Sequence, residues 1–531
     1  MKNHDYVLVV YFIAAAALAL ANQTGYAGSA TWQANPTSGD WNTAANWMPN
    51  TVPNSSTDSA EFGFSNTANV SISASVDVDV ISFDAGASAY SITAPPNTVL
   101  TFSAGVANNS GLMQTFVAES DSSGGGVFEI FGIGSGSGDL TTFVLKGGQG
   151  SGAQGGGVSL LAGSAMSSTF LNGGGMVPGA LGAIVDFLGS AVLGTATIVS
   201  DGGQVSGASG GETLFFAAED AQNATIIANG GVASGAGGAI VFFMGNSRAG
   251  AATLVANGGT NAGDGGLIEF HNTSVGSTAR VEVFGNGNLD ISSHSGGVTI
   301  GSLEGDGLVF LGAQVLSVGS GALSTTFSGV MQDRGISGRT GGSLIKIGTT
   351  TLTLTGANIY TGGTTVSAGT LVINNTTGSG TGTGAVNVTG GTLGGKGIIS
   401  GVVTVNSGAF LAPAHGTKQQ ATLTIQSPLT FNASSTYTYT FKAKKKQAKT
   451  DKVIANGVTI NSGASFNLSG TTKGTLTSGL VLTVISNTSA NPISGTFSNL
   501  ADGAIISVNG NNLQASYEGG DGNDLTLTVV P

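Results

Sequence analysis

The sequence predicts an all-β solenoid, a parallel β-helix, because one short phrase returns at a constant interval. TIVSDGG begins at Thr197, TIIANGG at Thr225 and TLVANGG at Thr253, which sets a period of 28 residues. Each phrase alternates apolar and small polar residues and ends on a glycine doublet, the pattern of a strand followed by a turn. A period of this length suits one coil of a β-helix better than a propeller blade or a helical repeat.

The repeats also align chemically, as columns of like residues. Asp201, Asn229 and Asn257 fill one column, and a phenylalanine stands ten residues ahead of each phrase. The phenylalanine column consists of Phe187, Phe215, Phe243 and Phe270. Because successive coils of a β-helix lie about 4.8 Å apart, we expect an internal aromatic stack and a row of turn-capping amides.

Composition narrows the class of protein further. Charged residues make up 8% of the 531 residues and the net charge is −12, so a nucleic-acid-binding surface is not expected. The chain has no cysteine, which removes disulfides, thiol catalysis and cysteine-based zinc sites. An apolar content of 40% argues against disorder. A chain this long exceeds one ordinary core, but a solenoid escapes that limit because each coil contacts only its neighbours.

In chain order, residues 1–27 are predicted to be a signal peptide. Lys2 precedes an apolar run from Tyr6 to Ala21, and small residues suited to cleavage follow. The alternative is a membrane anchor, which normally needs about 20 apolar residues. We therefore expect an exported protein, and no transmembrane segment in the mature chain.

Residues 28–65 are predicted to cap the first coil. The segment contains all three tryptophans, Trp32, Trp41 and Trp47. A solenoid must cover its open end with an atypical segment, and a compact Trp-rich one can do so. A carbohydrate-stacking site is the alternative that three nearby indoles leave open.

The remainder divides into Gly-rich repeats of about 28 residues over 66–340 and a second region over 341–531. The second region alternates strictly, as in Thr351-Leu352-Thr353-Leu354-Thr355, so one face is buried and the other is rich in hydroxyls. A charge run from Phe441 to Lys452 interrupts it. We interpret this run as a solvated turn or long loop, with contact to an anionic glycan or lipopolysaccharide as the alternative.

The second region resembles the autotransporter-associated β-strand repeat of passenger domains and other large secreted bacterial surface proteins. The family pattern is a Lys-x-Gly-x-Gly-x-Leu-x-Leu strand followed by Gly-x-Asn-x-Tyr-x-Gly-x-Thr, and Thr350 replaces the usual second glycine of the strand. The matching positions are Lys346, Gly348, Leu352, Leu354, Gly356, Asn358, Tyr360, Gly362 and Thr364. The resemblance implies a right-handed β-helix that is secreted or displayed at the cell surface, with outer-membrane association as one form of display.

The sequence predicts no catalytic, cofactor-binding or metal-ligating residues. Of the close acidic pairs, Glu119 with Asp121 and Glu304 with Asp306 are interpreted as turn residues, and Glu219 with Asp220 would be adjacent on a strand and so face opposite ways. The histidines are scattered in sequence: His4, His271, His294 and His415. The segment from Gly519 to Asp524 matches the start of a calcium nonapeptide, but it is a single copy, and Thr526 stands where a large apolar residue is expected.

These observations predict a non-enzymatic, secreted or cell-surface β-helical protein that is passenger-like or adhesin-like. Its expected partners are surface glycans or other cells, bound by many weak contacts. One alternative is a polysaccharide-degrading enzyme, a lyase or glycoside hydrolase, which would need clustered acids on one strand face. Another is a carbohydrate- or ice-binding surface of threonine rows such as Thr351, Thr353 and Thr355.

Overall fold

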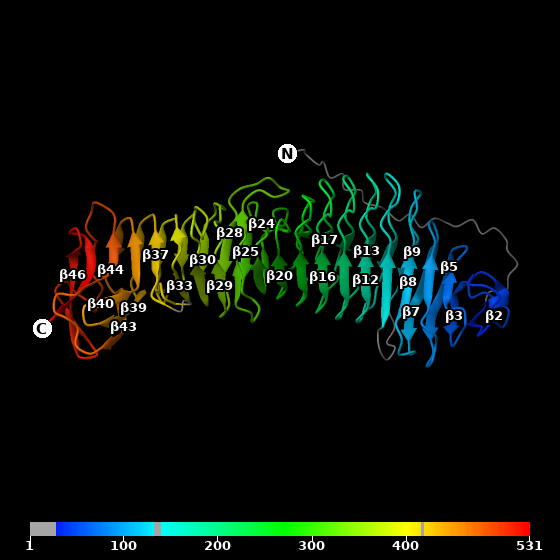
Figure 1. Cartoon of the computed structure of the whole chain (residues 1–531), viewed down its shortest axis with the longest axis horizontal. Coiled ribbons are helices and arrows are strands. Elements are labelled where there is room, and N and C mark those ends of the chain that lie inside the picture. Colours follow the sequence, from blue (N-terminus) through cyan, green and yellow to red (C-terminus); the bar gives the residue numbers. More distant parts are fainter. Residues whose placement is uncertain (1–27, 132–139, 416–418) are drawn as a thin grey trace.

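The computed structural model of the chain describes residues 28–131, 140–415 and 419–531, and the predicted signal peptide lies outside these residues. They form 47 strands and one 3-10 helix, Ala44–Asn46. The strands stack along the axis of a rod, with the N-terminal coils at one end and the C-terminal ones at the other (Figure 1). The predicted all-β parallel β-helix is confirmed.

One sheet, which we call the long sheet, runs along almost the whole rod. Its neighbouring strands are parallel except for the β39–β40 hairpin. Its strands are β4 (Asn69–Ser71), β6 (Ser91–Ala94), β8 (Gln114–Ala118), β10 (Thr141–Leu145), β12 (Thr169–Asn172), β14 (Thr197–Ser200), β16 (Thr225–Ala228), β18 (Thr253–Ala256), β20 (Arg280–Val283), β23 (Ser302–Gly305), β26 (Thr325–Phe327), β29 (Thr351–Leu354), β31 (Thr370–Ile373), β33 (Thr392–Gly395), β36 (Phe410–Leu411), β39 (Thr436–Lys444), β40 (Gln447–Thr450) and β43 (Ser465–Lys473).

A second sheet, the N-terminal sheet, supplies the other strand of each early coil. All its pairings are parallel except that of β1 with β2. Its strands are β2 (Trp47–Met48), β1 (Ala30–Trp32), β3 (Ser55–Phe62), β5 (Val76–Phe83), β7 (Val99–Asn108), β9 (Val127–Ile130), β11 (Gly157–Leu160), β13 (Ile184–Phe187), β15 (Glu212–Phe215), β17 (Ile240–Phe243), β19 (Leu267–Phe270), β21 (Asn288–Asp290), β24 (Leu308–Phe310) and β27 (Val330–Gln332).

Two further sheets complete the later coils. The third sheet contains β22 (Val298–Ile300), β25 (Val315–Val318), β28 (Ser343–Lys346), β30 (Thr364–Val366), β32 (Val386–Val388), β35 (Val403–Val405), β38 (Leu429–Phe431) and β42 (Val458–Ile460). The C-terminal sheet contains β34 (Ile398–Ile399), β37 (Thr422–Ile425), β41 (Lys452–Ala455), β44 (Val481–Asn487), β47 (Asp524–Val530), β46 (Asn511–Gly519) and β45 (Ile505–Val508). The last four of these strands pair antiparallel, so hairpins close this end.

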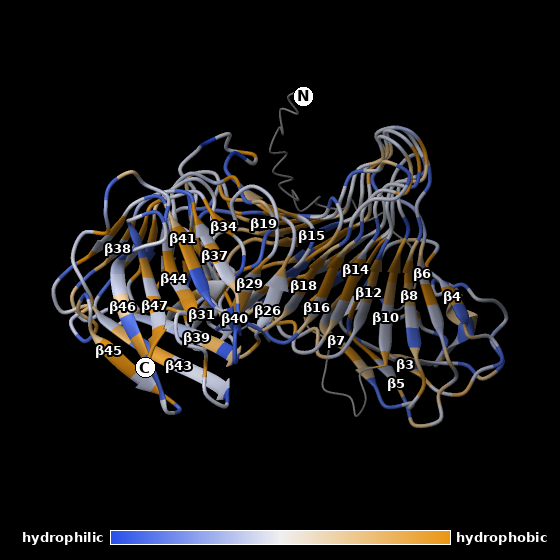
Figure 2. Cartoon of the chain, turned by 60° about the vertical axis from the view of Figure 1, so that its left-hand side comes forward, coloured by the Kyte–Doolittle hydropathy of each residue, from blue (hydrophilic) through white to orange (hydrophobic). Residues whose placement is uncertain are grey.

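Each early coil consists of two strands, a connecting segment that contains one isolated β-bridge residue, and a Gly-rich loop. In one of them β13 leads to β14, residues 201–211 form the loop, and β15 begins the next coil. Register partners Thr197 and Thr225 are therefore one 28-residue period apart. Later coils lack so long a loop: Leu352 pairs with Leu371, only 19 residues on. Figure 2 shows the long-sheet strands side by side along the rod.

The predicted aromatic stack is confirmed, and it is part of a longer column. Rings of Phe187, Phe215, Phe243 and Phe270 lie 5.0, 4.5 and 4.9 Å apart and nearly parallel. Toward the N-terminal end of the rod, Phe187 contacts the edge of Phe170, which belongs to the long sheet. Phe170 in turn stacks on Phe143, and Phe143 stacks on Phe116. All of these rings are buried. The column thus joins the two sheets through the core of the rod.

The asparagine column links coils directly. Asn229 donates through Nδ2 to Asp201 Oδ1 at 2.9 Å, and Asn257 donates to Asn229 Oδ1 at the same distance. The neighbouring glycines bring backbones together: a Cβ on Gly230 would lie 2.3 Å from the Gly259 nitrogen. We call this turn after each long-sheet strand a corner. Its hydrogen bonds between coils and its close backbone contacts explain why amide and glycine residues recur at fixed positions in the repeat.

The N-terminal tryptophans form a closed cluster at the first coil. Trp32, Trp41 and Trp47 are 2%, 0% and 0% exposed, and all three pack around Phe62. Each indole nitrogen donates to a backbone carbonyl. No indole face is free to stack on a sugar, so the capping interpretation fits the structure and the carbohydrate-stacking alternative does not.

Candidate functional site

The outward face of the long sheet carries two uninterrupted columns of side chains from β8 to β18. Strand register places one residue of each type on every strand. The threonine column is Thr115, Thr142, Thr169, Thr197, Thr225 and Thr253. The aliphatic column is Val117, Val144, Leu171, Val199, Ile227 and Val255. We call the two columns together the threonine-aliphatic face.

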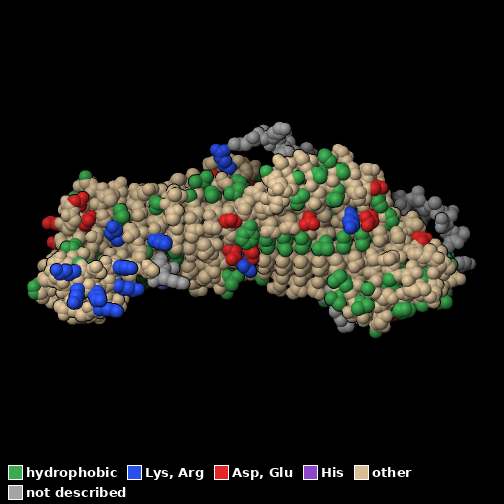
Figure 3. All heavy atoms as spheres, in the orientation of Figure 1, with side chains coloured by type: hydrophobic (Ala, Val, Ile, Leu, Met, Phe, Trp, Pro, Cys, Tyr) green, Lys and Arg blue, Asp and Glu red, His purple; other side chains and the backbone are tan. Residues whose placement is uncertain are grey.

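Alternation along each strand directs these residues outward. In β16, Ile226 and Ala228 are buried while Thr225 and Ile227 are partly exposed. Because successive residues of a strand point to opposite faces, the buried partners fill the core and leave the threonine and the aliphatic residue outside. Figure 3 shows a straight row of hydrophobic side chains along this part of the long sheet.

The threonine hydroxyls of this face have no partner within the described chain. None of the six forms a hydrogen bond through its side chain to another described group. Five of these threonines are partly exposed and Thr142 is buried, so the five exposed hydroxyls can donate to and accept from an external molecule. Along the rod the hydroxyls repeat about every 4.8 Å, the spacing of neighbouring strands. The face can form regular hydrogen bonds and apolar contacts.

Both columns end at charged residues of β20: Arg280 follows the threonine column and Glu282 follows the aliphatic column. Arg280 continues the threonine column, and its Nε lies 3.0 Å from Glu282 Oε1 and 2.5 Å from Glu304 Oε1. The hydrogen bond that Arg280 donates to Glu304 and the charges of both carboxylates raise the pKa of Arg280. In Figure 3 the hydrophobic row ends beside a group of acidic and basic side chains. The charged residues set one limit of the threonine-aliphatic face.

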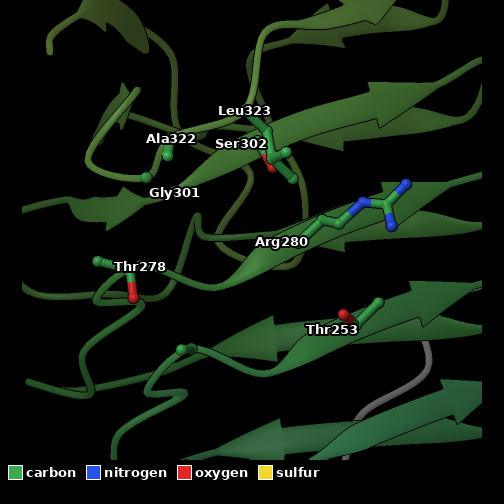
Figure 4. Close-up of a pocket in the computed structure, with 9 residues that line it drawn as sticks. Thr253, Thr278, Arg280, Gly301, Ser302, Ala322 and Leu323 are labelled. Atoms are coloured by element: carbon green, nitrogen blue, oxygen red, sulfur yellow. The ribbon is translucent and has the colours of Figure 1, made fainter. Parts of the chain in front are cut away.

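A shallow hollow of about 440 Å³ opens beside this arginine. Its lining residues come from strand starts and the turns before them: Ala251, Thr253, Thr278, Arg280, Gly301, Ser302, Gly321, Ala322 and Leu323. Figure 4 shows Arg280 extending along the sheet, with Thr253 and Ser302 on the strands either side. The hollow is thus continuous with the end of the threonine column.

The threonines predicted as a binding row lie elsewhere on the same sheet. Thr351 and Thr353 point outward from β29, but Thr355 lies beyond the strand. Thr353 has Thr326 on one side and Val372 on the other, so no Thr-x-Thr row continues. The longer column was signalled in the sequence, because each repeated phrase begins with threonine.

The motif residues of the resembling repeat have structural roles. Asn358 accepts from the Met331 amide and donates to the Gly380 carbonyl, which joins its coil to both neighbours. Tyr360 is buried and hydrogen-bonds Thr364. Lys346 is buried, its ammonium donates to the carbonyls of Ile347 and Gly348, and burial lowers its pKa to about 8.

The structure gives members of the three acidic pairs separate hydrogen-bond partners. Asp121 caps its own turn, where hydrogen bonds from Ser123 lower its pKa. Burial raises the pKa of Glu219, whose Oε2 accepts from the Ala217 amide. Asp306 accepts from the Gly285 amide. Glu304 is the exception to the turn interpretation, because it lies on β23 and pairs with Arg280.

Coil stacking brings together acids that are far apart in sequence, which local spacing could not reveal. Asp186 of β13 and Glu212 of β15 lie diagonally across adjacent strands of the N-terminal sheet. Burial, then the nearby Glu212, raise the pKa of Asp186 to about 7, and burial raises the pKa of Glu212. Asp186 Oδ1 has no hydrogen-bond partner. A raised carboxyl pKa suits a general acid, although structural burial produces the same shift.

A second such group contains a histidine. Glu269 Oε2 lies 2.6 Å from His271 Nε2, and Asp290 is the register partner of Glu269 on the next coil. Burial raises the pKa of both acids, and the histidine hydrogen bond opposes that shift at Glu269. Asp290 also accepts from the amides of Ser292 and Ile336. The group holds the 336 loop against the sheet.

The structure gives the calcium-like segment another role. Asp524 Oδ1 accepts from the Asn487 amide at 2.8 Å, a bond that joins β47 to its neighbour β44. His294 is buried elsewhere and bonds the Ser274 carbonyl, and burial lowers its pKa. Among the residues that the structure describes, no group of three or more His, Cys, Asp or Glu is placed to hold a metal ion.

The lysine-rich run is not a loop, contrary to the sequence interpretation. Most of its residues lie in the antiparallel β39–β40 hairpin, with Lys442 opposite Lys449. The alternation of Tyr437, Tyr439 and Phe441 into the core extends the strand through the charged region. Strand propensity and core contacts thus outweigh the charge of the run.

The described ranges contain no helix that is long and apolar enough to span a membrane.

Comparison with known families identifies one segment. Residues 344–373 match the family model described as passenger-associated-transport-repeat, which confirms the resemblance to autotransporter passenger proteins in this region. No curated protein matches the chain in sequence. Among solved structures, the Haemophilus influenzae Hap adhesin is similar at 10% identity with a TM-score of 0.21; the match covers 89% of this chain and 64% of that one.

Proposed function

We propose that the chain is a non-enzymatic, passenger-like and adhesin-like rod, secreted or displayed at the cell surface, that contacts glycans through its long sheet. The observation that carries this proposal is the threonine-aliphatic face, with the same two outward side chains repeated on six successive strands. The passenger-type repeat at 344–373 supports the extracellular setting.

Binding would be multivalent. Each strand except β10, where Thr142 is buried, offers one free hydroxyl and one apolar side chain, which match the hydroxyl groups and C–H surfaces of a sugar. A single such contact is weak, but contacts on one stiff scaffold act at a high effective concentration. A solenoid is stiff because every coil packs against the coils on both sides of it. The spacing of the side chains on the face is therefore maintained along the rod.

The test is binding of residues 28–531 to an array of neutral and acidic glycans. The variant Thr197→Val, Thr225→Val, Thr253→Val removes three hydroxyls from the face with little change in shape. We expect its affinity for bound neutral glycans to fall about tenfold or more, since each hydrogen bond contributes about 0.5–1.5 kcal/mol. The matched control, Thr365→Val, Thr404→Val, Thr430→Val, changes outward threonines of the third sheet.

Two results would contradict the proposal. One is an unmodified chain that binds no glycan on the array. The other is equal loss of binding in both triple variants, because the control residues lie on a different sheet. Thermal hysteresis without glycan binding would favour the ice-binding alternative, which uses the same face.

A polysaccharide-degrading enzyme is the second candidate, and Asp186 with Glu212 is the observation that favours it. The pair combines a raised pKa with a neighbouring carboxylate, as acid–base catalysis requires. The hollow beside Arg280 is not lined by this pair. Release of reducing sugar from pectin or alginate, lost on Asp186→Asn, would replace the adhesive function with a catalytic one.

A further inference from the structure

The C-terminal end of the long sheet carries a concentrated group of exposed lysines, which we call the lysine face. They lie on β39, on β43 and on the hairpin that joins β39 to β40. Its members are Lys442, Lys444, Lys445, Lys446, Lys449 and Lys473. Figure 3 shows them as a cluster of basic side chains at the end of the rod.

Strand register holds these charges close together. Lys442 lies directly opposite Lys449 across the hairpin, and Lys444 lies opposite Lys473 on the other side of β39. Directly opposed residues have Cβ atoms about 4.5–5.5 Å apart, and like charges at that separation destabilise a sheet. The arrangement therefore opposes folding and requires compensation from another source.

That compensation does not come from the described chain. The protein has 28 acidic residues and a net charge of −12, yet no ion pair of the described residues includes any of these six lysines. The one acid of the hairpin region, Asp451, is buried and accepts from Thr440 and Ala421. The lysine face is thus a locally unbalanced positive surface on an acidic protein.

Protection of a sheet edge explains only part of the group. Lysines on an edge strand prevent unwanted pairing with other chains, and Lys449 on β40 and Lys473 on β43 can serve that purpose. Lys442 and Lys444 cannot, because β39 has a partner strand on both sides there. The charges on the central strand indicate a ligand rather than edge protection.

The surroundings of the lysines favour one kind of polyanion. Ser469 and Thr471 point outward between them from β43, whereas Tyr437, Tyr439 and Phe441 are buried. No large hydrophobic side chain is exposed between described residues 436 and 473. This segment consequently offers no ring on which a nucleic-acid base could stack and no apolar anchor for a bilayer; the exposed ring of Phe410 lies on β36, opposite Thr436 at the far end of β39 from the lysines. Ammonium groups interleaved with hydroxyls match a sugar polymer that carries carboxylates or sulfates.

We propose that the lysine face binds an acidic polysaccharide. The proposal deepens the adhesive function and rests on it for the glycan setting, but it uses different strands from the threonine-aliphatic face. Six cations on one short surface supply long-range attraction to a polyanion, and the neighbouring hydroxyls bond its sugar groups.

The experiment measures affinity of residues 28–531 for alginate, with dextran as the uncharged polymer. One variant is Lys442→Gln, Lys444→Gln, Lys449→Gln; the charge-matched control is Lys396→Gln, Arg334→Gln, Arg339→Gln at exposed sites elsewhere. We expect the lysine variant to lose about tenfold or more in affinity, which is about 1.4 kcal/mol, and the control to bind as the unmodified chain does. Affinity should fall as salt rises.

Equal weakening of both triple variants would overturn the proposal in favour of net charge alone, and so would absence of alginate binding. Tighter binding to single-stranded DNA or to vesicles of anionic phospholipid than to alginate would overturn the choice of partner. The three Thr→Val changes of the threonine-aliphatic face should leave alginate binding intact. Loss of neutral-glycan binding alone would then count against the adhesive function and not against this site.

Discussion

Individual glycines in this protein are explained by the distance between two backbones. Gly202 and Gly230 occupy equivalent corners, and a Cβ on Gly202 would lie 2.3 Å from the Gly230 oxygen. No real Cβ tolerates such an approach, so each corner excludes every side chain. The glycine doublets therefore recur in the sequence because stacked coils leave no room for a side chain at these positions.

We expect Gly230→Ala to lower the free energy of unfolding by about 1–3 kcal/mol, because the added methyl group must push two backbones apart. Denaturant unfolding followed by circular dichroism measures the change. The control is Gly63→Ala, where a Cβ would meet no atom within 4 Å and φ is not positive. Equal effects of the two substitutions would contradict the close approach at the corner.

Asp186 makes stability depend on pH. Its pKa is 3.8 in the unfolded reference and about 7 in the folded chain, so the folded state binds more protons between these values. The free energy of unfolding should therefore fall as pH rises from 3.8 to about 7, and remain reduced above it. Asp186→Asn should flatten this dependence and raise Tm at pH 8.

Thermal unfolding at a series of pH values from 4 to 8 tests this expectation. The exposed Asp84 provides the comparison, as Asp84→Asn should leave the pH profile unchanged. A profile of Asp186→Asn identical to that of the unmodified chain would show that Asp186 does not carry the shift.

At the scale of the repeat, columns whose members are evenly spaced in sequence could be predicted, and columns with uneven spacing could not. The Phe187 to Phe270 stack follows from a near-constant period. A second amide ladder joins Asn406, Asn432 and Asn461 at 2.9 Å per step, but its spacing changes from 26 to 29 residues, so no period reveals it. The Asp186 and Glu212 pair could not be predicted for a related reason. The two residues are far apart in sequence and become neighbours only because their coils stack.

Loss of one ring from the aromatic column should destabilise the coils on either side of it. Phe215 contacts Phe187 and Phe243 on the coils either side, so Phe215→Ala should cost about 3–5 kcal/mol in local stability. Because a solenoid coil depends on its neighbours, hydrogen exchange should accelerate first in β13, β15 and β17. The milder Phe215→Leu should give the same pattern with smaller rates. Uniform acceleration along the whole chain would contradict nearest-neighbour stability.

At the scale of the molecule, the two proposed binding surfaces share one sheet and differ in chemistry. The threonine-aliphatic face is uncharged and lies over β8 to β18, and the lysine face lies over β39 to β43. Parallel register sets the spacing of the threonine-aliphatic face, and the lysine face combines a parallel pairing of β39 with β43 and an antiparallel pairing of β39 with β40. Both proposals therefore depend on coils that stack in register, which can be measured without any ligand.

Disulfide cross-linking can measure whether the coils stack in register. The sequence contains no cysteine, so a pair introduced by mutation has no competing thiol in the chain. Thr197 and Thr225 are register partners on adjacent coils, about 4.8 Å apart, within the range of Cα distances that a disulfide spans. Thr197→Cys with Thr225→Cys should therefore cross-link under mild oxidation. Thr197→Cys with Thr253→Cys, two coils apart, should not. Cross-linking of the distant pair as readily as the adjacent pair would contradict the stacked, in-register solenoid.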